Sequence, residues 1–445
     1  MRLFLVAVNE MTPTAYARLL LGSLGRLGLQ VRTDERSAAS LWRDSGGMWL
    51  TSLNPAKPRT CSAPVASAMQ GAWLALDALM GNSLNSEFDA YRLLGERAAI
   101  SGFTPGGEQS SGRAAHLCKT LDGWLVVNLA RDCDYDLMPA WLEEPVHDLA
   151  QIKAVVASRF SEGLVARGRE MGLAISHHED RSLIREASSW VYGRRYARRH
   201  ALPRSAPLVL DLSSLWAGPL CGQMLRECGA RVIKIESEDR PDGARRGSPE
   251  FYQILNADKE SVALDLRAAE GRGYLDKLLA RADIIIEASR PRALEQMGFQ
   301  ASGYVRRGQG KVWLSITGYG RSPLSRNWIG FGDDVATAAG LSTAVGEPPV
   351  FCADAVADPL TGIHAAVAAM ESWMRGGGEL LDVSLFSVAA HVAKLSDPNM
   401  AQWAGRPMRP RARALPSNTT QFGADTERVL KEFLPPSDSA RINSL

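Results

Sequence analysis

Short β-rich runs alternate with helical patterns through the middle of the chain, and this alternation restricts the possible folds more than any other feature. The β-rich runs are Leu208–Leu212, Arg231–Glu236, Asp283–Glu287 and Lys311–Thr317. The helical patterns between them are Gly218–Cys228, Ala268–Ala280 and Ala293–Gln300. Strands that alternate with helices build parallel sheets with right-handed crossovers. The sequence therefore predicts an α/β fold with a doubly wound, Rossmann-like parallel sheet.

The 445 residues are too many for one ordinary core, and the patterns divide the chain into four segments. Residues 1–108 are helical. Residues 109–200 begin with an Asp-Gly turn signal and a hairpin strand, Gly123–Ala130, so a smaller α+β domain is expected there. Residues 201–395 hold the alternating runs, and residues 396–445 form a Pro/Arg-rich tail that closes with a terminal helix. Further helical segments are predicted at Met69–Met80, Glu87–Ala99, Leu137–Leu142 and Leu149–Gly172.

Composition and charge exclude several classes of partner. A net charge of +2, with 45% hydrophobic and 22% charged residues, predicts no nucleic acid and no membrane as partner. The arginine clusters Arg194–Arg199 and Arg406–Arg413 are interpreted as surface linkers rather than polyanion sites. The apolar run after Met1 is too short for a signal peptide or a membrane span, and the six cysteines form no CxxC pair. We therefore expect a cytoplasmic protein with reduced thiols.

Asp358 is the strongest candidate for chemistry in the chain. It is a lone carboxylate after an alternating Ala-Val-Ala stretch in the segment Phe351–Ala366, just before Gly362 and an apolar helical pattern. A carboxylate in such a setting can be desolvated and positioned to act as a nucleophile or a base. The segment Ala63–Ala78 repeats the same outline, but Ser67 takes the place of the acid. The backbone shape alone therefore does not require the acid, and we expect Ser67 to be inert.

Signatures for dinucleotides, nucleoside phosphates and metals are missing from the sequence. The loop Ser213–Pro219 leads into a helix whose free N–H groups can take a phosphate, but no GxGxxG or GxxxxGK[ST] occurs. The run Ser176–Asp180 contains histidines and acids, yet adjacent residues point in different directions, so a solvated loop is favoured over a metal site. His364 follows Asp358 by six residues, and a structural hydrogen bond is its expected role. No metal is predicted.

Several separated motifs resemble the family III CoA-transferases, the group that contains formyl-CoA and carnitine CoA-transferases and α-methylacyl-CoA racemase. The resemblance covers about residues 205–390 with order and spacing intact. The motifs are LDLSSLWAGPLCGQMLRECGARVIKIES, NADKESVALDLR, ADIIIEASRPRALEQMGF, ITGYG, GFGDDVATAAG, AVADPLTGIH and GELLDVSL. Several motifs that occur in the order and at the spacing of the family indicate it more strongly than any single motif does.

The resemblance implies an enzyme in which Asp358 is the catalytic nucleophile. Its carboxylate would attack an acyl-CoA thioester to give an acyl-aspartyl anhydride, and the released CoA thiolate would convert this into an aspartyl-CoA thioester. Backbone N–H groups near Gly362 are candidates for stabilising the oxyanions. CoA is then a substrate, with no tightly bound cofactor, and the partners are an acyl-CoA, a carboxylic acid and a second copy of the chain in a homodimer. By residue match, CoA would contact Leu215, Trp216, Ala217, Arg245, Leu264 and Arg267.

The chain departs from the family pattern in its order and in its CoA pocket. The small-domain strand precedes the CoA-binding half instead of following it, and residues 1–108 resemble a degenerate copy of the catalytic half. Ser237 and Gln296 stand where the family has arginines, and Ala288 stands where it has an asparagine. The glycine-rich loop that covers the transferase site has no evident counterpart.

Two alternatives stay open. An acyl-CoA racemase or isomerase would use Asp358 as a base, but Phe331 occupies the position of the racemase histidine and disfavours this reaction. The other alternative is a non-catalytic acyl-CoA-binding subunit, which the altered CoA positions and the rearranged order would suit.

Asp333 and Asp334 have two possible interpretations. They either match an acidic position of the family or are charges at a helix N-terminus.

Overall fold

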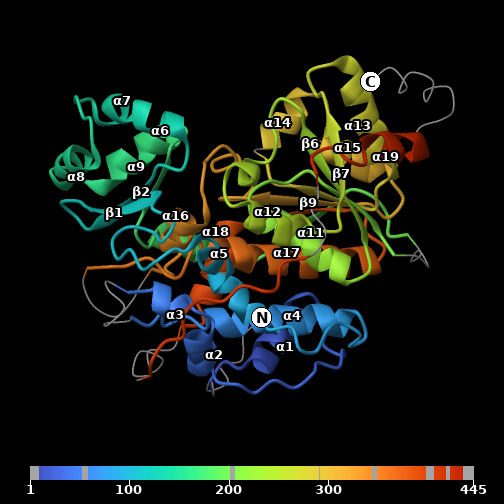
Figure 1. The fold of residues 1–445 in the computed structure, drawn as a ribbon, viewed down its shortest axis with the longest axis horizontal. Helices are drawn as coiled ribbons and strands as arrows, with labels where there is room; N and C mark the ends of the chain where they lie inside the picture. The colour runs from blue at the N-terminus through green and yellow to red at the C-terminus, as the bar shows by residue number, and fades with distance from the viewer. Residues whose placement is uncertain are drawn as a thin grey trace. The chain divides into compact units, whose positions relative to one another are not determined.

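The chain forms two compact units in the computed structural model (Figure 1). Unit 1 contains Met1–Trp190, Trp328–Leu360 and Leu385–Ala412, and unit 2 contains Val191–Asn327, Thr361–Ser384 and Arg413–Leu445. Each unit is thus assembled from three separate stretches of sequence. The structure describes residues 10–52, 59–200, 206–289, 291–342, 348–396, 405–416 and 421–433.

The division of the sequence into four segments stays a prediction. Parts of it lie outside the described residues, namely 1–9 and 53–58 of the first segment, 201–205, 290 and 343–347 of the third, and 397–404, 417–420 and 434–445 of the tail.

A seven-stranded sheet organises unit 2, with the strand order β4-β10-β9-β8-β5-β6-β7. The strands are β4 (Tyr192–Arg195), β5 (Leu208–Asp211), β6 (Arg231–Ser237), β7 (Glu260–Leu264), β8 (Ile284–Glu287), β9 (Val312–Thr317) and β10 (Glu379–Ser384). All neighbouring strands are parallel except β4 and β10. β5 pairs with β6 on one side and with β8 on the other, so the strand order reverses there. The predicted doubly wound sheet is confirmed, and its topological switch point lies at the carboxyl ends of β5 and β8.

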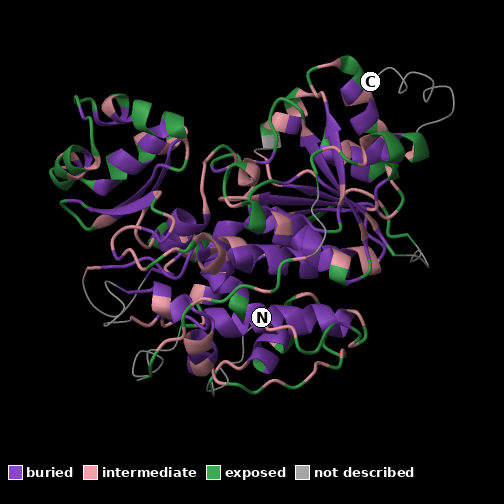
Figure 2. Ribbon diagram, in the orientation of Figure 1, coloured by how far each residue is buried: buried purple, intermediate pink, exposed green. Residues whose placement is uncertain are grey.

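Helices cover both faces of this sheet (Figure 1). α13, α15 and α19 pack on one face, and α11 and α12 lie on the other. The helices are α11 (Ala217–Glu227), α12 (Pro249–Asn256), α13 (Ala269–Arg281), α14 (Pro291–Gln296), α15 (Ala301–Arg307) and α19 (Thr426–Phe433). Figure 2 shows that the strands between them are buried. Because both faces are covered, the central strands are almost continuously apolar, which made β5, β6, β8 and β9 recognisable in the sequence.

β4 corrects the interpretation of Arg194–Arg199 as a linker. Residues Tyr192–Arg195 pair with β10 as an antiparallel edge strand, and all four are exposed. An antiparallel edge strand on an otherwise parallel sheet is a common arrangement. Since β4 has no buried face, it lacks the apolar alternation that would have marked it as a strand in the sequence.

Side chains from the last described segment cover the outer edge of β7. The backbone N–H of Ser261 donates to the Asp425 carboxylate at 2.9 Å, and the N–H of Ala263 donates to the Thr426 hydroxyl at 2.9 Å. The N–H of Asp425 donates back to the carbonyl of Ser261 at 2.9 Å. Val429 and Leu430 of α19 are buried beside this edge, which confirms the predicted terminal helix.

Asp425→Ala is expected to lower the free energy of unfolding by about 1–2 kcal/mol, because it leaves the Ser261 N–H without its acceptor and removes a side chain at the start of α19. Urea unfolding followed by circular dichroism measures the change. Glu427→Ala is the control, since this side chain is 63% exposed on the same helix and its surface ion pair contributes less than about 0.5 kcal/mol. Equal losses in the two variants would contradict the expectation.

Unit 1 contains a small antiparallel sheet with the order β1-β2-β3. Its strands are β1 (Ala115–Lys119), β2 (Trp124–Asn128) and β3 (Ala174–His177), and four helices lie between β2 and β3: α6 (Asp132–Asp136), α7 (Met138–Leu142), α8 (Leu149–Ala157) and α9 (Ser161–Glu170). The β1–β2 hairpin confirms the predicted strand after the Asp-Gly turn. The helical segment predicted over Leu149–Gly172 is broken, because Asp122 accepts hydrogen bonds from the N–H and the hydroxyl of Ser161, both at 2.9 Å.

Helices joined by loops make up most of the rest of unit 1, among the residues that the structure describes. Its helices are α1 (Pro13–Ser23), α2 (Ala38–Asp44), α3 (Gly47–Leu50), α4 (Val65–Leu79), α5 (Leu93–Ser101), α10 (Arg181–Glu186), α16 (Gly332–Ala338) and α18 (Leu385–Ala393). Every residue of α4 is buried, and α1 packs on it so closely that a Cβ at Gly71 would lie 2.7 Å from Tyr16 Cβ. α17 (Ala357–Met374) is shared, since the residues up to Leu360 belong to unit 1 and the rest to unit 2. None of the helices among the described residues has the length and hydropathy needed to cross a bilayer.

Candidate active site

Asp358 lies in the first turn of α17, and it is not the lone carboxylate that the sequence indicated. Asp354 lies in the turn before the helix, Asp333 lies at the start of α16, and the charges of both act on Asp358. Asp333 and Asp354 are 8% and 0% exposed, whereas Asp358 is partly exposed. Of these three carboxylates, Asp358 is therefore the most exposed.

The surroundings of Asp358 place its ionisation near neutral pH. Burial raises the pKa of Asp358 to about 7, and the negative charges of Asp333 and Asp354 contribute to the rise. The Arg97 guanidinium and a hydrogen bond from the Gly332 N–H oppose it. A carboxyl group with a pKa near neutrality is partly ionised at pH 7 and suits nucleophilic or proton-transfer chemistry.

Gly332 permits the close approach of α16 to Asp358. A Cβ at this position would lie 2.2 Å from Asp358 Oδ2 and 2.4 Å from the carbonyl oxygen of Ala355. The first N–H groups of a helix have no partner within the helix, and that of Gly332 is used by Asp358. The hydrogen bond to the carboxylate thus depends on the missing side chain.

Asp333 and Asp334 hold the start of α16 against its neighbours. Asp333 Oδ1 accepts the N–H of Ala355 at 2.9 Å. Asp334 Oδ1 accepts the N–H of Phe331 at 2.9 Å and the side-chain amide of Asn128 at 2.7 Å. Burial raises the pKa of Asp334 to about 8. Asp334 is therefore a helix-start residue, while Asp333 connects the helix to the turn before α17.

Arg97 completes this cluster from α5. Its Nε lies 2.9 Å from Asp354 Oδ2, and its Nη2 lies 2.6 Å from Asp354 Oδ1. The guanidinium also lies 5.7 Å from the centroid of the Phe103 ring. A two-point ion pair to a fully buried carboxylate fixes the orientation of both groups. Sequence reasoning missed this pair, because 257 positions separate its members.

The turn before α17 has a strained backbone that is held from two sides. Ala353 and Ala355 have φ values of 53° and 43°, in the left-handed region that residues other than glycine rarely adopt. The N–H of Ala353 donates to Thr51 Oγ1 at 2.8 Å, and the Ser111 hydroxyl donates to the Ala353 carbonyl at 3.4 Å. Strain that the surroundings enforce is typical of functional sites.

The CoA-contact positions expected from the sequence lie in unit 2, and Leu215 is on the loop that follows β5 at the switch point. Leu215 is 44% exposed and has a φ of 71°. Its N–H donates to Asp242 Oδ1 at 2.9 Å, and Lys234 Nζ lies 2.9 Å from Asp242 Oδ2. Both side chains of that ion pair are fully buried. A buried ion pair therefore holds the loop in a conformation that exposes Leu215.

Trp216, Ala217 and Leu264 are all buried. The Trp216 ring meets Phe251 edge-on at 5.1 Å between centroids. Ala217 begins α11, and its carbonyl oxygen would lie 2.7 Å from a Cβ at Gly362. The side chains at these three positions pack in the core of unit 2.

The two arginines expected to contact CoA differ in exposure and in how tightly carboxylates hold them. Arg245 makes a two-point ion pair with Glu236, at 2.9 and 2.7 Å, and lies 4.1 Å from the centroid of the Tyr252 ring. Arg267 is 75% exposed, and its Nε lies 3.5 Å from Asp239 Oδ2. A new anion could engage Arg267 with little rearrangement, whereas Arg245 would have to share its guanidinium with Glu236.

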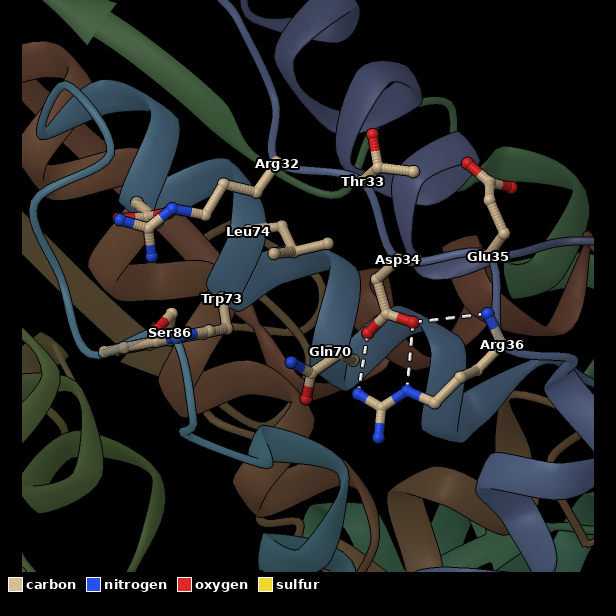
Figure 3. A pocket seen from close by; sticks show the side chains of 10 residues that line it. Arg32, Thr33, Asp34, Glu35, Arg36, Gln70, Trp73, Leu74 and Ser86 are labelled. Atoms are coloured by element: carbon tan, nitrogen blue, oxygen red, sulfur yellow. Dashed lines mark hydrogen bonds and ion pairs between the residues drawn. The ribbon is translucent and has the colours of Figure 1, made fainter.

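A hollow of about 410 Å³ in unit 1 contains none of these residues (Figure 3). Its lining includes Gln70 of α4 and two ion pairs, Arg36 with Asp34 at 2.7 Å and Arg32 with Asp77 at 3.3 Å. Both arginines in this hollow already have carboxylate partners.

The run Ser176–Asp180 is not the solvated loop that the sequence predicted, because Ser176 lies in β3 and both Ser176 and Asp180 are buried. Asp180 begins α10, where its carboxylate accepts the N–H of Leu183 at 3.2 Å, and it pairs with Arg169 at 3.2 Å. Ser67 and His364 are fully buried. Among the described residues, no group of three or more His, Cys, Asp or Glu side chains is placed to hold a metal ion.

Gly362 corrects the expectation that its N–H could stabilise an oxyanion. It lies in the second turn of α17, where backbone N–H groups bond to carbonyls one turn earlier. The glycine that lends an N–H to Asp358 is Gly332.

Comparisons with known proteins match the part of the chain that contains Asp358. The model of CoA-transferase family III matches residues 207–423. A succinate–glutarate CoA-transferase from Agrobacterium fabrum is 32% identical over 218 residues, which are 44% of this chain and 54% of the relative. A succinyl-CoA–D-citramalate CoA-transferase from Chloroflexus aurantiacus is 28% identical over 204 residues, which are 43% of this chain and 51% of the relative.

Among solved structures, a CAIB/BAIF family protein from Brucella suis aligns with a TM-score of 0.40 and 27% identity, over 44% of this chain and 56% of that one. The chain spans about half the length of the relatives it matches.

Proposed function

Residues 207–423 match the model of CoA-transferase family III, and from that premise we propose that the chain moves CoA between carboxylic acids with Asp358 as the nucleophile. One observation carries the proposal. Asp358 is a partly exposed carboxylate beside two buried ones, it follows a strained turn, and its pKa is raised to about 7. A nucleophile needs this combination of access, fixed position and partial ionisation.

The reaction proceeds through three covalent intermediates, an anhydride, an aspartyl-CoA thioester and a second anhydride. The Asp358 carboxylate attacks the thioester carbonyl of the acyl-CoA, the C–S bond breaks, and a mixed anhydride and a CoA thiolate result. The thiolate then attacks the aspartyl carbonyl of the anhydride. The donor carboxylate is expelled, and an aspartyl-CoA thioester is formed. The acceptor carboxylate attacks the carbonyl of this thioester, the C–S bond breaks, and a second mixed anhydride and the CoA thiolate result. The thiolate then attacks the acyl carbonyl of this anhydride and expels the Asp358 carboxylate. New acyl-CoA leaves and Asp358 is regenerated.

We propose that the exposed loop at Leu215 and the nearby positions of unit 2 bind the CoA moiety. The fixed backbone of this loop supports the proposal, as does the exposed guanidinium of Arg267. Trp216, Ala217 and Leu264 then contribute backbone and shape, since their side chains are buried, and Arg245 contributes through its remaining donors. Ser237, Ala288 and Gln296 replace polar family positions, so fewer charged contacts to CoA are expected than in the relatives.

Arg267→Ala is expected to raise the KM for acyl-CoA about threefold to fivefold and to leave kcat unchanged, because an exposed charge pair contributes at most about 1 kcal/mol. The effect should shrink as the salt concentration rises. Steady-state kinetics at two ionic strengths measure it. Arg281→Ala, which removes an exposed arginine at the far end of α13, is the control and should leave KM unchanged.

Mass spectrometry of the protein after incubation with a panel of acyl-CoAs tests the proposed function. We expect a covalent CoA adduct on the peptide that contains Asp358, and hydroxylamine should convert it to an aspartyl hydroxamate. Exchange of label between free carboxylic acids and the acyl-CoA pool should accompany it. Absence of both adduct and exchange across the panel would refute the proposal.

The same experiment separates the alternatives. A racemase or isomerase would exchange the α-proton of the acyl group with deuterium from solvent and form no adduct. Phe331, which packs at the N-terminus of α16 and cannot transfer a proton, argues against it. A binding subunit would retain CoA without any turnover. A homodimer and a cytoplasmic location stay predictions of the proposed function.

A further inference from the structure

We propose that Arg97 and Asp354 form a positioning pair for Asp358: the ion pair fixes the turn from which α17 begins and supplies the cation that Asp358 faces. The inference rests on the proposed function of Asp358. Arg97 lies outside the region that matches the family, so this contribution comes from the rearranged N-terminal part of the chain.

The geometry of the pair suits a positioning role. Two N–H groups of one guanidinium donate to both oxygens of Asp354, at 2.9 and 2.6 Å. Asp354 stands between Ala353 and Ala355, the two residues with left-handed backbone, and its side chain is fully buried. Since Asp358 follows by one turn, rotation of Asp354 would move the first turn of the helix. A planar fork holds a carboxylate in one orientation, which a single ammonium group does not.

The charges around Asp358 support a second role for the same pair. The charged groups that act on Asp358 are Arg97 from α5, Asp333 from α16 and Asp354 from the turn. The charge of Asp333 also acts on its neighbour Asp334. Arg97 is therefore the cation of this set, and Asp354 holds it in place through the two-point ion pair. Loss of Arg97 and loss of Asp354 must then shift the ionisation of Asp358 in opposite directions.

The rate of adduct formation as a function of pH tests the inference with the full-length protein and an acyl-CoA that labels the wild type. Because attack needs ionised Asp358, the rate should rise with pH and reach its midpoint near pH 7. In Arg97→Met the midpoint should move up by about one unit or more, because an opposing charge is lost. In Asp354→Asn it should move down, since an anion is lost and Arg97 is released.

Arg97→Lys separates position from charge. It retains the cation but loses the two-point contact, so the midpoint should stay near that of the wild type while the rate falls about tenfold. Arg92→Met, which removes an exposed arginine that lies before α5 and pairs with the half-buried Asp89, is the matched control and should change neither quantity. Circular dichroism establishes that each variant is folded. If Arg97→Met does not fold, Asp354→Asn and Arg97→Lys still decide the outcome.

Opposite displacements of the midpoint in Arg97→Met and Asp354→Asn support the inference. Rate losses with an unchanged midpoint in both variants would show a purely structural role and overturn it. A wild type that forms no adduct would overturn the proposed function, and this inference with it, whereas a wild-type adduct with unshifted variants overturns this inference alone.

Discussion

Asp358→Asn should reduce CoA exchange by at least about four orders of magnitude, because an amide of the same shape cannot form the anhydride or the thioester. The hydroxylamine-sensitive adduct should disappear at the same time. Binding of CoA should persist, since the proposed CoA contacts lie on other residues. Radiolabel exchange, mass spectrometry and equilibrium dialysis with CoA measure the three quantities on one preparation.

Ser67→Ala is the matched control for this substitution. Ser67 occupies the corresponding position in the repeated segment, and among the described residues its buried hydroxyl has no hydrogen-bond partner. Its removal should leave exchange unchanged. Exchange above about 1% of the wild-type rate in Asp358→Asn would require another nucleophile and would contradict the assignment.

Gly332→Ala should lower the rate of exchange at least about 100-fold and the free energy of unfolding by about 2–3 kcal/mol. The new Cβ would lie 2.2 Å from Asp358 Oδ2 and 2.4 Å from the Ala355 carbonyl, and one of those contacts is to backbone that cannot move aside locally. The carboxylate must therefore turn away or α16 must shift, and either change breaks the hydrogen bond from position 332. Exchange kinetics and urea unfolding measure the two effects.

Gly163→Ala provides the comparison for this prediction. Gly163 lies in α9 of the same unit, and nothing lies within 4 Å of the Cβ position. Alanine is favoured over glycine inside a helix, so this variant should be more stable by about 0.5–1 kcal/mol and equally active. A stable and active Gly332→Ala protein would show that the close packing against Asp358 is not needed.

Local patterns were sufficient for much of the larger sheet. The apolar runs of β5, β6, β8 and β9 can be recognised from a few consecutive residues. The predicted bounds of each strand agree with the structure to within one residue at either end. β4 could not be found in this way, because its strand conformation depends on pairing with β10, almost 190 positions later. The break between α8 and α9 likewise depends on Asp122, which lies outside both helices.

The candidate site divides in the same manner. Asp358 could be predicted because its motif is contiguous in the sequence. No local pattern marks Arg97, since its role depends on the fold, which brings it to Asp354. Gly332 was visible only as one glycine among many, and its role emerges from a contact with a carboxylate 26 positions later. Arg245 and Arg267 matched the family equally well in sequence, and only the structure separates an arginine with a bidentate partner from an exposed one.

The two outer strands of the large sheet meet solvent in different ways, and this bears on self-association. At β4 the exposed side chains include Arg194 and Arg195, and charge on an edge strand deters pairing with another molecule. At β7 the outward N–H groups of Ser261 and Ala263 are already occupied by Asp425 and Thr426. Proteolysis before Asp425 would therefore uncover an uncharged stretch of edge backbone, open to an added strand from a neighbouring chain. The segment that begins α19 thus occupies an edge that an added strand would otherwise use.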